Sequence, residues 1–261
     1  MRPGRVVPPS SGRGSAAAIV ASPTPEVPDY HRAMVEPSER PDVRVEAFHL
    51  ADFVHPSESP LAGRPGLVMG YAVCHPDGVL LFDTGIGLGN SEITAWLHAR
   101  IERLPGLLIG RGIRPEDVQA IANSHLHFDH CGQNLAFPDR PIYAQADEYE
   151  ATRTNDYTIP EWVDFPGAHF ELIRGEHELM PRVRLVPTPG HTPGHQSLLI
   201  DAAVGRIAIV GQAVYRRAEW DGSDEPDDSG LHGAWNAVAY RSSRNLLRDF
   251  EPDLVLFGHD R

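Results

Sequence analysis

The chain has 261 residues, which is long enough for one large domain with a sizeable core or for two small ones. Its formal net charge is −13, and an acidic surface repels nucleic-acid backbones and anionic membranes, so we expect neither as a partner. All 23 basic residues are arginines, which excludes a lysine nucleophile.

The cysteines and the apolar runs bear on the compartment. Cys74 and Cys131 are too few for a disulfide framework, and they suit a reducing compartment. No apolar run approaches the roughly 18 residues that a membrane helix needs. The apolar patch at residues 16–21 is shorter than the roughly 7–15 residues of a signal-peptide core. We therefore expect a cytoplasmic protein, with export as the alternative.

Residues 1–40 are rich in Pro, Ser, Gly and Ala and have no apolar periodicity. This composition predicts a disordered tail. An alternative is that translation begins at Met34, which would leave residues 1–33 outside the natural protein. The remaining residues, 41–261, are predicted to form one domain.

Short apolar runs separated by turns follow the tail and predict strands. In chain order, the predicted strands are 43–50, 67–75, 79–85, 118–125, 141–145, 169–173, 183–188, 197–201, 206–211 and 253–259. The predicted helices are 90–104, 115–119, 146–153 and 234–250. Strands with interspersed helices and short connections indicate a mixed α/β class.

Polar residues stand where several predicted strands run into loops. Asp83, His125, Gln212 and His259 all hold such positions. Loops at the ends of strands are where α/β proteins usually build their sites, because a rigid scaffold positions the side chains.

The segment NSHLHFDHCGQN, residues 123–134, holds three histidines and an aspartate within six residues. His125 and His127 alternate on an extended segment, so their imidazoles can point the same way. Asp129 and His130 follow at the turn. Imidazole and carboxylate suit Zn²⁺, and also Mn²⁺, Fe²⁺ or Co²⁺. The segment therefore predicts part of a site for one metal or two.

Two later motifs can complete this site. TPGHTPGH supplies His191 and His195, and a tight turn at Pro189 and Gly190 fixes the direction of His191. FGHD supplies His259 directly after an apolar strand. A lone histidine is usually a surface or core residue. The H-x-H-x-D-H spacing together with histidines at two further strand exits is hard to obtain by chance.

The segment HLHFDH resembles the H-x-H-x-D-H signature of the metallo-β-lactamase superfamily. FDTG, TPGHTPGH and FGHD resemble the other motifs of that family in the expected order, and the resemblance spans about residues 42–261. It implies a four-layer αββα sandwich of the α/β class, with the metals at one edge between the two sheets.

The resemblance also implies roles for individual residues. The ligands of a first metal would be His125, His127 and His191, and those of a second would be Asp129, His130 and His259. Asp83 resembles a carboxylate that orients ligands through hydrogen bonds. His195 is expected to support the site rather than to bind metal.

One position departs from the family. The family has an aspartate that bridges both metals after the glycine that ends the strand at 206–211, and here that position is Gln212. A carboxylate bridges with two anionic oxygens, whereas a neutral amide offers one carbonyl oxygen and no charge. We expect Gln212 to be a weak ligand or none, and the second site to hold its metal weakly or to be only partly filled.

Hydrolysis is the expected reaction, because a metal lowers the pKa of a bound water towards about 7 and polarises a carbonyl or phosphoryl oxygen. Asp129 would orient the attacking water and later protonate the leaving oxygen. TPGHTPGHQSLLI, AVY and FGHD look like the N-acyl homoserine lactonase branch, in which a tyrosine three residues after the bridging aspartate contacts the lactone carbonyl. Tyr215 stands three residues after Gln212. Its phenol would donate to that oxygen, unless it is only an aromatic beside a loop.

Other functions share this fold. A thioesterase of the glyoxalase II type and an iron dioxygenase acting on a persulfide are expected to keep the aspartate that Gln212 replaces. The absence of lysine disfavours a β-lactamase, and the net charge disfavours a nuclease. A non-catalytic metal- or ligand-binding protein with a degenerate second site is the alternative class. The favoured substrate is a small-molecule lactone or related ester, and either a monomer or a homodimer fits the sequence.

Overall fold

The structure of the chain is a computed structural model, in which residues 41–59, 61–154, 156–223 and 234–261 are described. The predicted tail at residues 1–40 and the alternative start at Met34 lie outside these residues. Within the described residues, no helix is both long enough and apolar enough to cross a bilayer.

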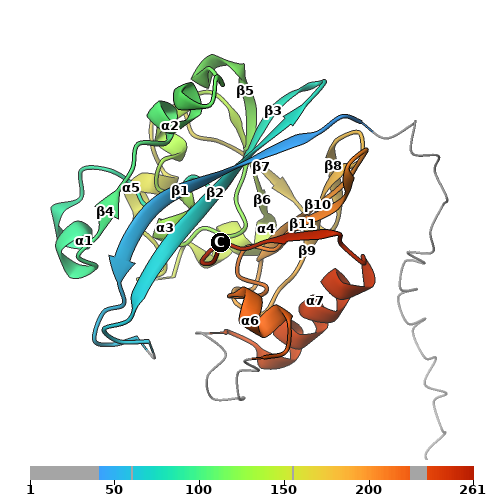
Figure 1. Cartoon of the computed structure of the whole chain (residues 1–261). Coiled ribbons are helices and arrows are strands. Elements are labelled where there is room, and N and C mark those ends of the chain that lie inside the picture. The colour runs from blue at the N-terminus through green and yellow to red at the C-terminus, as the bar shows by residue number, and fades with distance from the viewer. Residues whose placement is uncertain (1–40, 60, 155, 224–233) are drawn as a thin grey trace, which may run out of the picture. The chain divides into compact units, whose positions relative to one another are not determined.

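Two sheets form the centre of the described fold, as Figure 1 shows. The larger sheet has seven strands in the described residues, in the spatial order β4 (Arg100–Ile101), β1 (Arg44–Val54), β2 (Pro65–His75), β3 (Gly78–Phe82), β5 (Val118–Ala122), β6 (Pro141–Gln145) and β7 (His169–Ile173). The smaller sheet has five there, in the order β12 (Leu254–Leu256), β11 (Gly205–Ile209), β10 (Gln196–Ala202), β9 (Val183–Pro187) and β8 (His177–Met180).

Short helices connect these strands. The α-helices of the described residues are α1 (Ser91–Trp96), α2 (Leu104–Gly110), α3 (Phe128–Cys131), α4 (Ala146–Ala151), α5 (Pro160–Val163), α6 (Arg217–Trp220) and α7 (Ala237–Asp249). Two 3₁₀ turns, η2 (Pro115–Asp117) and η3 (Asn134–Ala136), lie on either side of α3 in the chain.

Side chains along each strand point alternately to the two faces of its sheet, and one face of each sheet forms the core between the sheets. In β10, Leu198 and Ile200 pack into this central core, whereas Leu199 faces the opposite side. In β3, Leu80 packs into the central core and Leu81 faces away from it. Both sheets therefore bury one face against the other sheet and still have an apolar outer face to cover.

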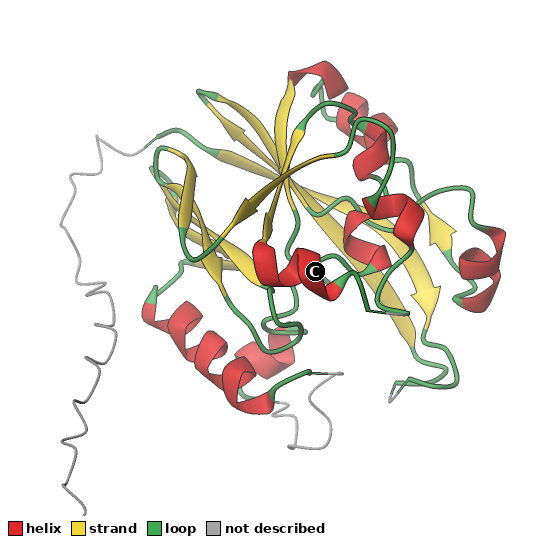
Figure 2. Ribbon diagram, turned by 180° about the vertical axis from the view of Figure 1, so that it is seen from behind, coloured by secondary structure: helices red, strands yellow, loops and turns green. Residues whose placement is uncertain are grey.

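Helices cover the two outer faces, as Figure 2 shows from behind. Leu81 of the larger sheet shares a buried cluster with Leu104 and Leu108 of α2. Leu199 of the smaller sheet shares another with Leu247 of α7. The order helix, sheet, sheet, helix confirms the predicted four-layer αββα sandwich.

The predicted single helix over residues 90–104 is wrong. Helix α1 ends at Trp96, and His98 adopts a left-handed φ of 48°, which turns the chain. Ile101 then pairs with Ala51 of β1, so residues 100–101 form the edge strand β4. A separate helix, α2, begins at Leu104. Pairing with β1 overrides the local helical pattern, because it satisfies backbone groups at the edge of the sheet.

Candidate metal centre

Two groups of metal-capable side chains occur in the described residues. One group is His125, His127 and His191, and the other is Asp129, His130 and His259. Within each group, one ligand atom from every residue lies within 4.8 Å of the others. The fold thus brings together six residues that the sequence places in three separate segments.

The segment after β5 carries four of these six residues. Strand β5 ends at Ala122, and His127, which has φ −64° and ψ 152°, is the residue directly before α3. Asp129 and His130 follow in the single turn of α3. The backbone N–H of Thr84, just after β3, donates to the carbonyl oxygen of His130 at 2.8 Å. The loops after two neighbouring strands are therefore tied together.

Two glycines let the loop that bears His191 lie between two helices. A Cβ on Gly190, whose φ is 142°, would lie 2.3 Å from Cα of Tyr240 in α7. A Cβ on Gly194 would lie 2.2 Å from the backbone nitrogen of Glu148 in α4. Real Cβ atoms do not approach backbone atoms so closely, so both positions of TPGHTPGH require glycine.

The nitrogens of the first group converge on one point. His127 Nδ1 lies 3.0 Å from His125 Nε2 and 3.3 Å from His191 Nε2. Tetrahedral Zn²⁺ with Zn–N bonds of about 2.0–2.1 Å separates its ligand nitrogens by about 3.3 Å. The three imidazoles therefore stand at the spacing that a single tetrahedral metal requires.

The second group has a similar spacing and adds a carboxylate. His130 Nε2 lies 3.2 Å from His259 Nε2. Asp129 Oδ2 lies 3.6 Å from the former atom and 3.7 Å from the latter. The donor set of two imidazoles and one carboxylate suits Zn²⁺ and other first-row divalent metals.

Hydrogen bonds on the far side of the rings fix how these histidines are turned. His130 Nδ1 lies 2.9 Å from Asp83 Oδ2, and His259 Nδ1 donates to the carbonyl oxygen of Leu67 at 2.8 Å. With one proton held on Nδ1, the Nε2 atom of each ring faces the centre of the group and is the atom that would bind a metal. The contact with His130 is the one that the predicted orienting role of Asp83 requires.

Burial keeps most of the histidines in the neutral form that binds metals. It lowers the pKa of His127 to about 4 and that of His259 to about 4. The same loss of solvation lowers the pKa values of His125 and His191 well below the usual range.

The carboxylates make the second group electrostatically attractive to a cation. Burial by itself would lower the pKa of His130, but Asp129 and Asp83 outweigh it and raise the pKa to about 9. Burial would likewise raise the pKa of Asp129, but His130 and His259 outweigh it and lower the pKa. A buried site with ionised carboxylates stabilises positive charge strongly.

His195 supports the position at which the family pattern predicts the bridging aspartate. Its Nε2 accepts the backbone N–H of Gln212 at 2.9 Å, and its Nδ1 lies 2.9 Å from Oγ1 of Thr188. Both ring nitrogens are therefore engaged away from the two groups. Gln212 is buried, and its side chain hydrogen-bonds to His130. The amide thus reaches the second group without adding charge.

Tyr215 lies against the second group together with a histidine that the sequence analysis missed. The Tyr215 ring stacks on the His259 ring, with 4.9 Å between centroids and 25° between planes. The Tyr215 hydroxyl lies 3.4 Å from Nε2 of His55. Burial lowers the pKa of His55, which favours its neutral form. No motif surrounds His55, so only the fold reveals its place beside Tyr215.

A cavity of about 260 Å³ joins both groups to an apolar wall. Its polar lining includes His127, Asp129, His191, Gln212, Tyr215 and His259. Its apolar wall comes from Phe53, Leu61, Trp96, Leu97 and Phe128. The arrangement combines a polar floor that can bind metal with a wall that can hold a hydrocarbon group.

Comparison with known proteins gives the family. Residues 63–259 match the family model described as the metallo-beta-lactamase superfamily. The chain belongs to the metallo-β-lactamase superfamily. This membership agrees with the four-layer fold and with the position of the two residue groups.

Within this superfamily, the chain is similar to several lactonases. It is 36 % identical over 160 residues to an N-acyl homoserine lactonase of Bacillus cereus, covering 61 % of this chain and 62 % of the relative. It is 32 % identical over 122 residues to N-acyl homoserine lactonase AttM of Rhizobium radiobacter, covering 42 % of this chain and 46 % of that one. The chain thus aligns with less than two thirds of the length of these relatives.

The fold of solved lactonases matches over more of the chain. A variant of AiiA from B. thuringiensis with N-decanoyl-L-homoserine bound at the active site has a TM-score of 0.69 and 26 % identity. The match covers 85 % of this chain and 94 % of that chain. An N-acyl homoserine lactone hydrolase with N-hexanoyl-L-homoserine at the catalytic metal centre has a TM-score of 0.68, 26 % identity and the same coverage.

Proposed function

We propose that this protein is a metal-dependent hydrolase that opens the ring of a lactone, with an N-acyl homoserine lactone as the favoured substrate class. The observation that carries the proposal is the convergence of two ligand groups on the floor of the cavity of about 260 Å³. The names of the similar Bacillus and Rhizobium proteins support the lactone as substrate. Zn²⁺ is the proposed metal, because the donor sets and nitrogen spacings suit it.

Each ligand group has its own role in the proposal. His125, His127 and His191 would hold the first metal, and Asp129, His130 and His259 would hold the second. A metal at this site would lower the pKa of water and polarise the ester carbonyl. Asp129, whose lowered pKa beside His130 and His259 keeps it ionised, would orient the attacking water, take up its proton and return that proton to the leaving ring oxygen.

Tyr215 would act on the carbonyl oxygen. Burial raises the pKa of its phenol, so the hydroxyl stays protonated and can donate a hydrogen bond. Stacking of its ring on His259 holds it beside the second group. A donor aimed at the oxygen that gains negative charge lowers the barrier to attack.

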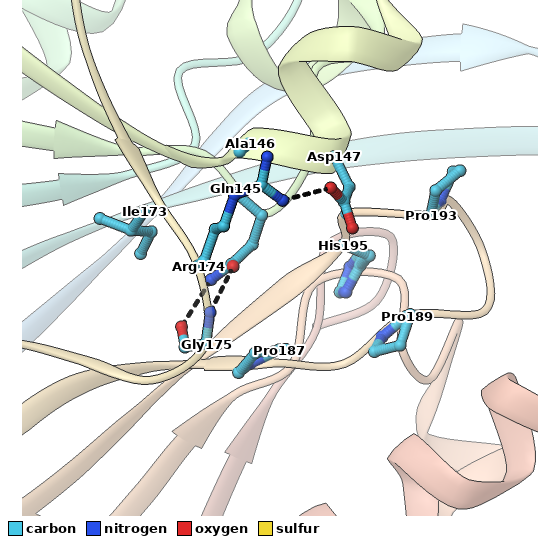
Figure 3. Close-up of a pocket in the computed structure, with 11 residues that line it drawn as sticks. Gln145, Ala146, Asp147, Ile173, Arg174, Gly175, Pro187, Pro189, Pro193 and His195 are labelled. Carbon is cyan, nitrogen blue, oxygen red and sulfur yellow. Dashed lines mark hydrogen bonds and ion pairs between the residues drawn. The ribbon is translucent and has the colours of Figure 1, made fainter.

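The apolar wall favours a substrate with an acyl chain. Trp96 and Phe128, whose ring centroids are 6.2 Å apart, and Leu61 line the cavity beside the ligands. A second cavity of about 190 Å³, seen in Figure 3, is lined by His195 and Pro193 among others, but by none of the proposed ligands. We therefore assign the substrate to the larger cavity.

Gln212 would make the two metal sites differ in charge and in metal affinity. Its amide carries no charge, so the first group binds through three neutral imidazoles and Asp129 is the one anionic ligand of the second group. We expect the second metal to be bound more weakly than it would be with an aspartate at this position.

Both cysteines, Cys74 and Cys131, are free thiols, which suits the proposed cytoplasmic location. A monomer or a homodimer is compatible with this proposal.

A panel of substrates tests the proposal. The Zn²⁺-loaded protein is assayed with lactones of several ring sizes and acyl chains, with open-chain esters, and with a thioester of the glyoxalase II type. His127→Ala is the control, because it removes a ligand of the first group. We expect hydrolysis of acyl lactones that disappears in the control. Turnover of the thioester alone, or activity that persists in His127→Ala, would overturn the proposal.

A further inference from the structure

The carboxylate of Glu148 lies almost completely buried behind the first group of histidines. Glu148 belongs to α4 and is 1 % exposed. Its Oε1 accepts the backbone N–H of Leu126 at 2.8 Å and the hydroxyl of Tyr157. Its Oε2 accepts the hydroxyl of Thr192 at 2.6 Å and the backbone N–H of Gly194 at 3.2 Å. All four partners can donate, which suits an ionised carboxylate that only accepts.

The four donors come from the two loops and the aromatic ring that surround the first group. Leu126 stands between His125 and His127, and Thr192 directly follows His191. One side chain therefore ties together the backbone segments that carry all three imidazoles of this group. Charge-assisted hydrogen bonds to an ionised carboxylate are stronger than neutral ones, so the two segments are held rigidly.

Tyr157 extends the same connection to an imidazole ring. Its ring packs against the His127 ring, with 4.7 Å between centroids and 51° between planes. Its hydroxyl donates to Glu148. The orientation of His127 therefore depends on Glu148 through both the backbone of Leu126 and the ring of Tyr157.

The packing of α4 against the loop keeps Glu148 in place. Gly194 approaches the backbone nitrogen of Glu148 so closely that a Cβ would lie 2.2 Å from it. Figure 3 shows the start of α4, with Ala146 and Asp147, beside Pro193 and His195 of this loop. Asp147, the neighbour of Glu148, is exposed and pairs with Arg174 at 2.9 Å.

The two histidines of the second group have supports of their own. His130 is oriented by Asp83, and His259 is oriented by the carbonyl oxygen of Leu67. No hydrogen bond described in the structure joins Glu148 to Asp129, His130 or His259. Loss of the Glu148 carboxylate should therefore loosen one group and not the other.

We propose that Glu148 is a positioning residue that sets the metal affinity of the His125, His127 and His191 group and has a much smaller effect on the other group. The inference rests on the proposed metal centre but not on the lactone substrate. Metal binding is measured without substrate, so failure of lactone hydrolysis would leave the inference standing. Outer residues that orient metal ligands typically change metal affinity by about 10–100-fold when mutated.

Two variants, each lacking a ligand of one group, allow the metal affinity of the other group to be measured separately. His259→Ala removes a ligand of the second group, and His127→Ala removes a ligand of the first. Glu148→Gln is introduced into each background, and Zn²⁺ affinity is measured by competition with a chromophoric chelator. An amide has a single acceptor oxygen, so the substitution leaves one backbone N–H, of Leu126 or Gly194, buried without its acceptor. Asp147→Asn is the matched control, because it changes the neighbouring exposed carboxylate in the same helix.

We expect Glu148→Gln to weaken Zn²⁺ binding by about 10–100-fold in the His259→Ala background and by less than about threefold in the His127→Ala background. Asp147→Asn should change neither affinity. Glu148→Asp, which keeps the charge, should restore part of the lost affinity. The absorption spectrum of bound Co²⁺ should change for Glu148→Gln in the His259→Ala background only.

Equal weakening in both backgrounds would show general damage and would overturn the inference. Unchanged affinity of the first group would overturn it as well. If Glu148→Gln does not fold, Thr192→Val tests the proposal instead. It removes one of the four hydrogen-bond donors to the Glu148 carboxylate and leaves the other three. It should weaken Zn²⁺ binding by the first group alone, and by less than Glu148→Gln does, about threefold to tenfold, since three of the four donors to the carboxylate remain. No change in its Zn²⁺ affinity would contradict the proposal.

Discussion

The backbone N–H of Gln212 donates to Nε2 of His195 at 2.9 Å. Because Thr188 engages the other ring nitrogen of His195, the ring cannot turn away, and the backbone at position 212 is fixed beside the second group. The side chain at position 212 is therefore carried by a fixed backbone and not by a mobile loop. This relationship makes the difference between an amide and a carboxylate there directly measurable.

Gln212→Asp should tighten the second metal. An aspartate at this rigid position adds one negative charge, shared by two carboxylate oxygens, beside the second group. We expect the affinity for the second Zn²⁺ equivalent to rise by more than about tenfold, because a direct ligand should matter at least as much as an outer-shell residue. Zn²⁺ titration with metal analysis measures this. Two equivalents bound equally tightly by both proteins would show that Gln212 does not weaken the site.

Tyr215→Phe should slow hydrolysis without changing metal content. The substitution removes the hydroxyl beside His55 but keeps the ring that stacks on His259. Loss of a donor to the developing oxyanion costs about 100-fold in kcat or more, and we expect a fall of about 10–100-fold because the donor is a single phenol. Tyr143→Phe, in β6 and outside the cavity lining, is the control. Unchanged kcat and KM would remove Tyr215 from the mechanism.

Metal removal should destabilise the fold. The two groups connect loops that follow β5, β9 and β12, so a bound metal links distant segments of the native state only. At a free Zn²⁺ concentration 100 times Kd, one site should add about 2.7 kcal/mol to the free energy of unfolding. Urea unfolding with Zn²⁺ and with a chelator measures the difference. His127→Ala should show a smaller difference than the unmodified chain, and an equal difference would argue against binding by the first group.

Two glycine substitutions should have opposite effects on stability. Gly190→Ala places a Cβ 2.3 Å from Cα of Tyr240 at a φ of 142°, so we expect a loss of about 2–4 kcal/mol in the free energy of unfolding. Gly106→Ala, in the exposed part of α2 with nothing within 4 Å, should stabilise by about 0.5–1 kcal/mol. Urea unfolding of the metal-free variants measures both. A neutral Gly190→Ala would mean that the loop can move away from α7.

The spacing of side chains in the sequence predicted which residues the fold brings together in the two groups, because much of that geometry is local. His125, His127, Asp129 and His130 lie within six residues that end in the single turn of α3, so a short loop suffices to bring them together. The turn at Gly190 likewise fixes His191 locally. The four layers were predicted from the family resemblance, whereas the pattern of strands and helices predicted only the mixed α/β class.

What the sequence could not predict depends on tertiary contacts. The end of α1 at Trp96 and the strand at residues 100–101 follow from pairing with β1, which no local pattern encodes. Glu148 sits in an ordinary helical stretch, and its role comes from donors 22 and 44 residues away. His55 has no motif around it, and only the fold brings it to Tyr215.

The most direct test of the central claim is the rate of N-acyl homoserine lactone hydrolysis as metal-free protein is titrated with Zn²⁺. We predict a negligible rate without metal, a rise as Zn²⁺ is added, and saturation at no more than two equivalents, with His127→Ala inactive throughout. A rate that is independent of Zn²⁺, or an absence of lactone opening at every metal loading, would contradict metal-dependent lactone hydrolysis by this protein.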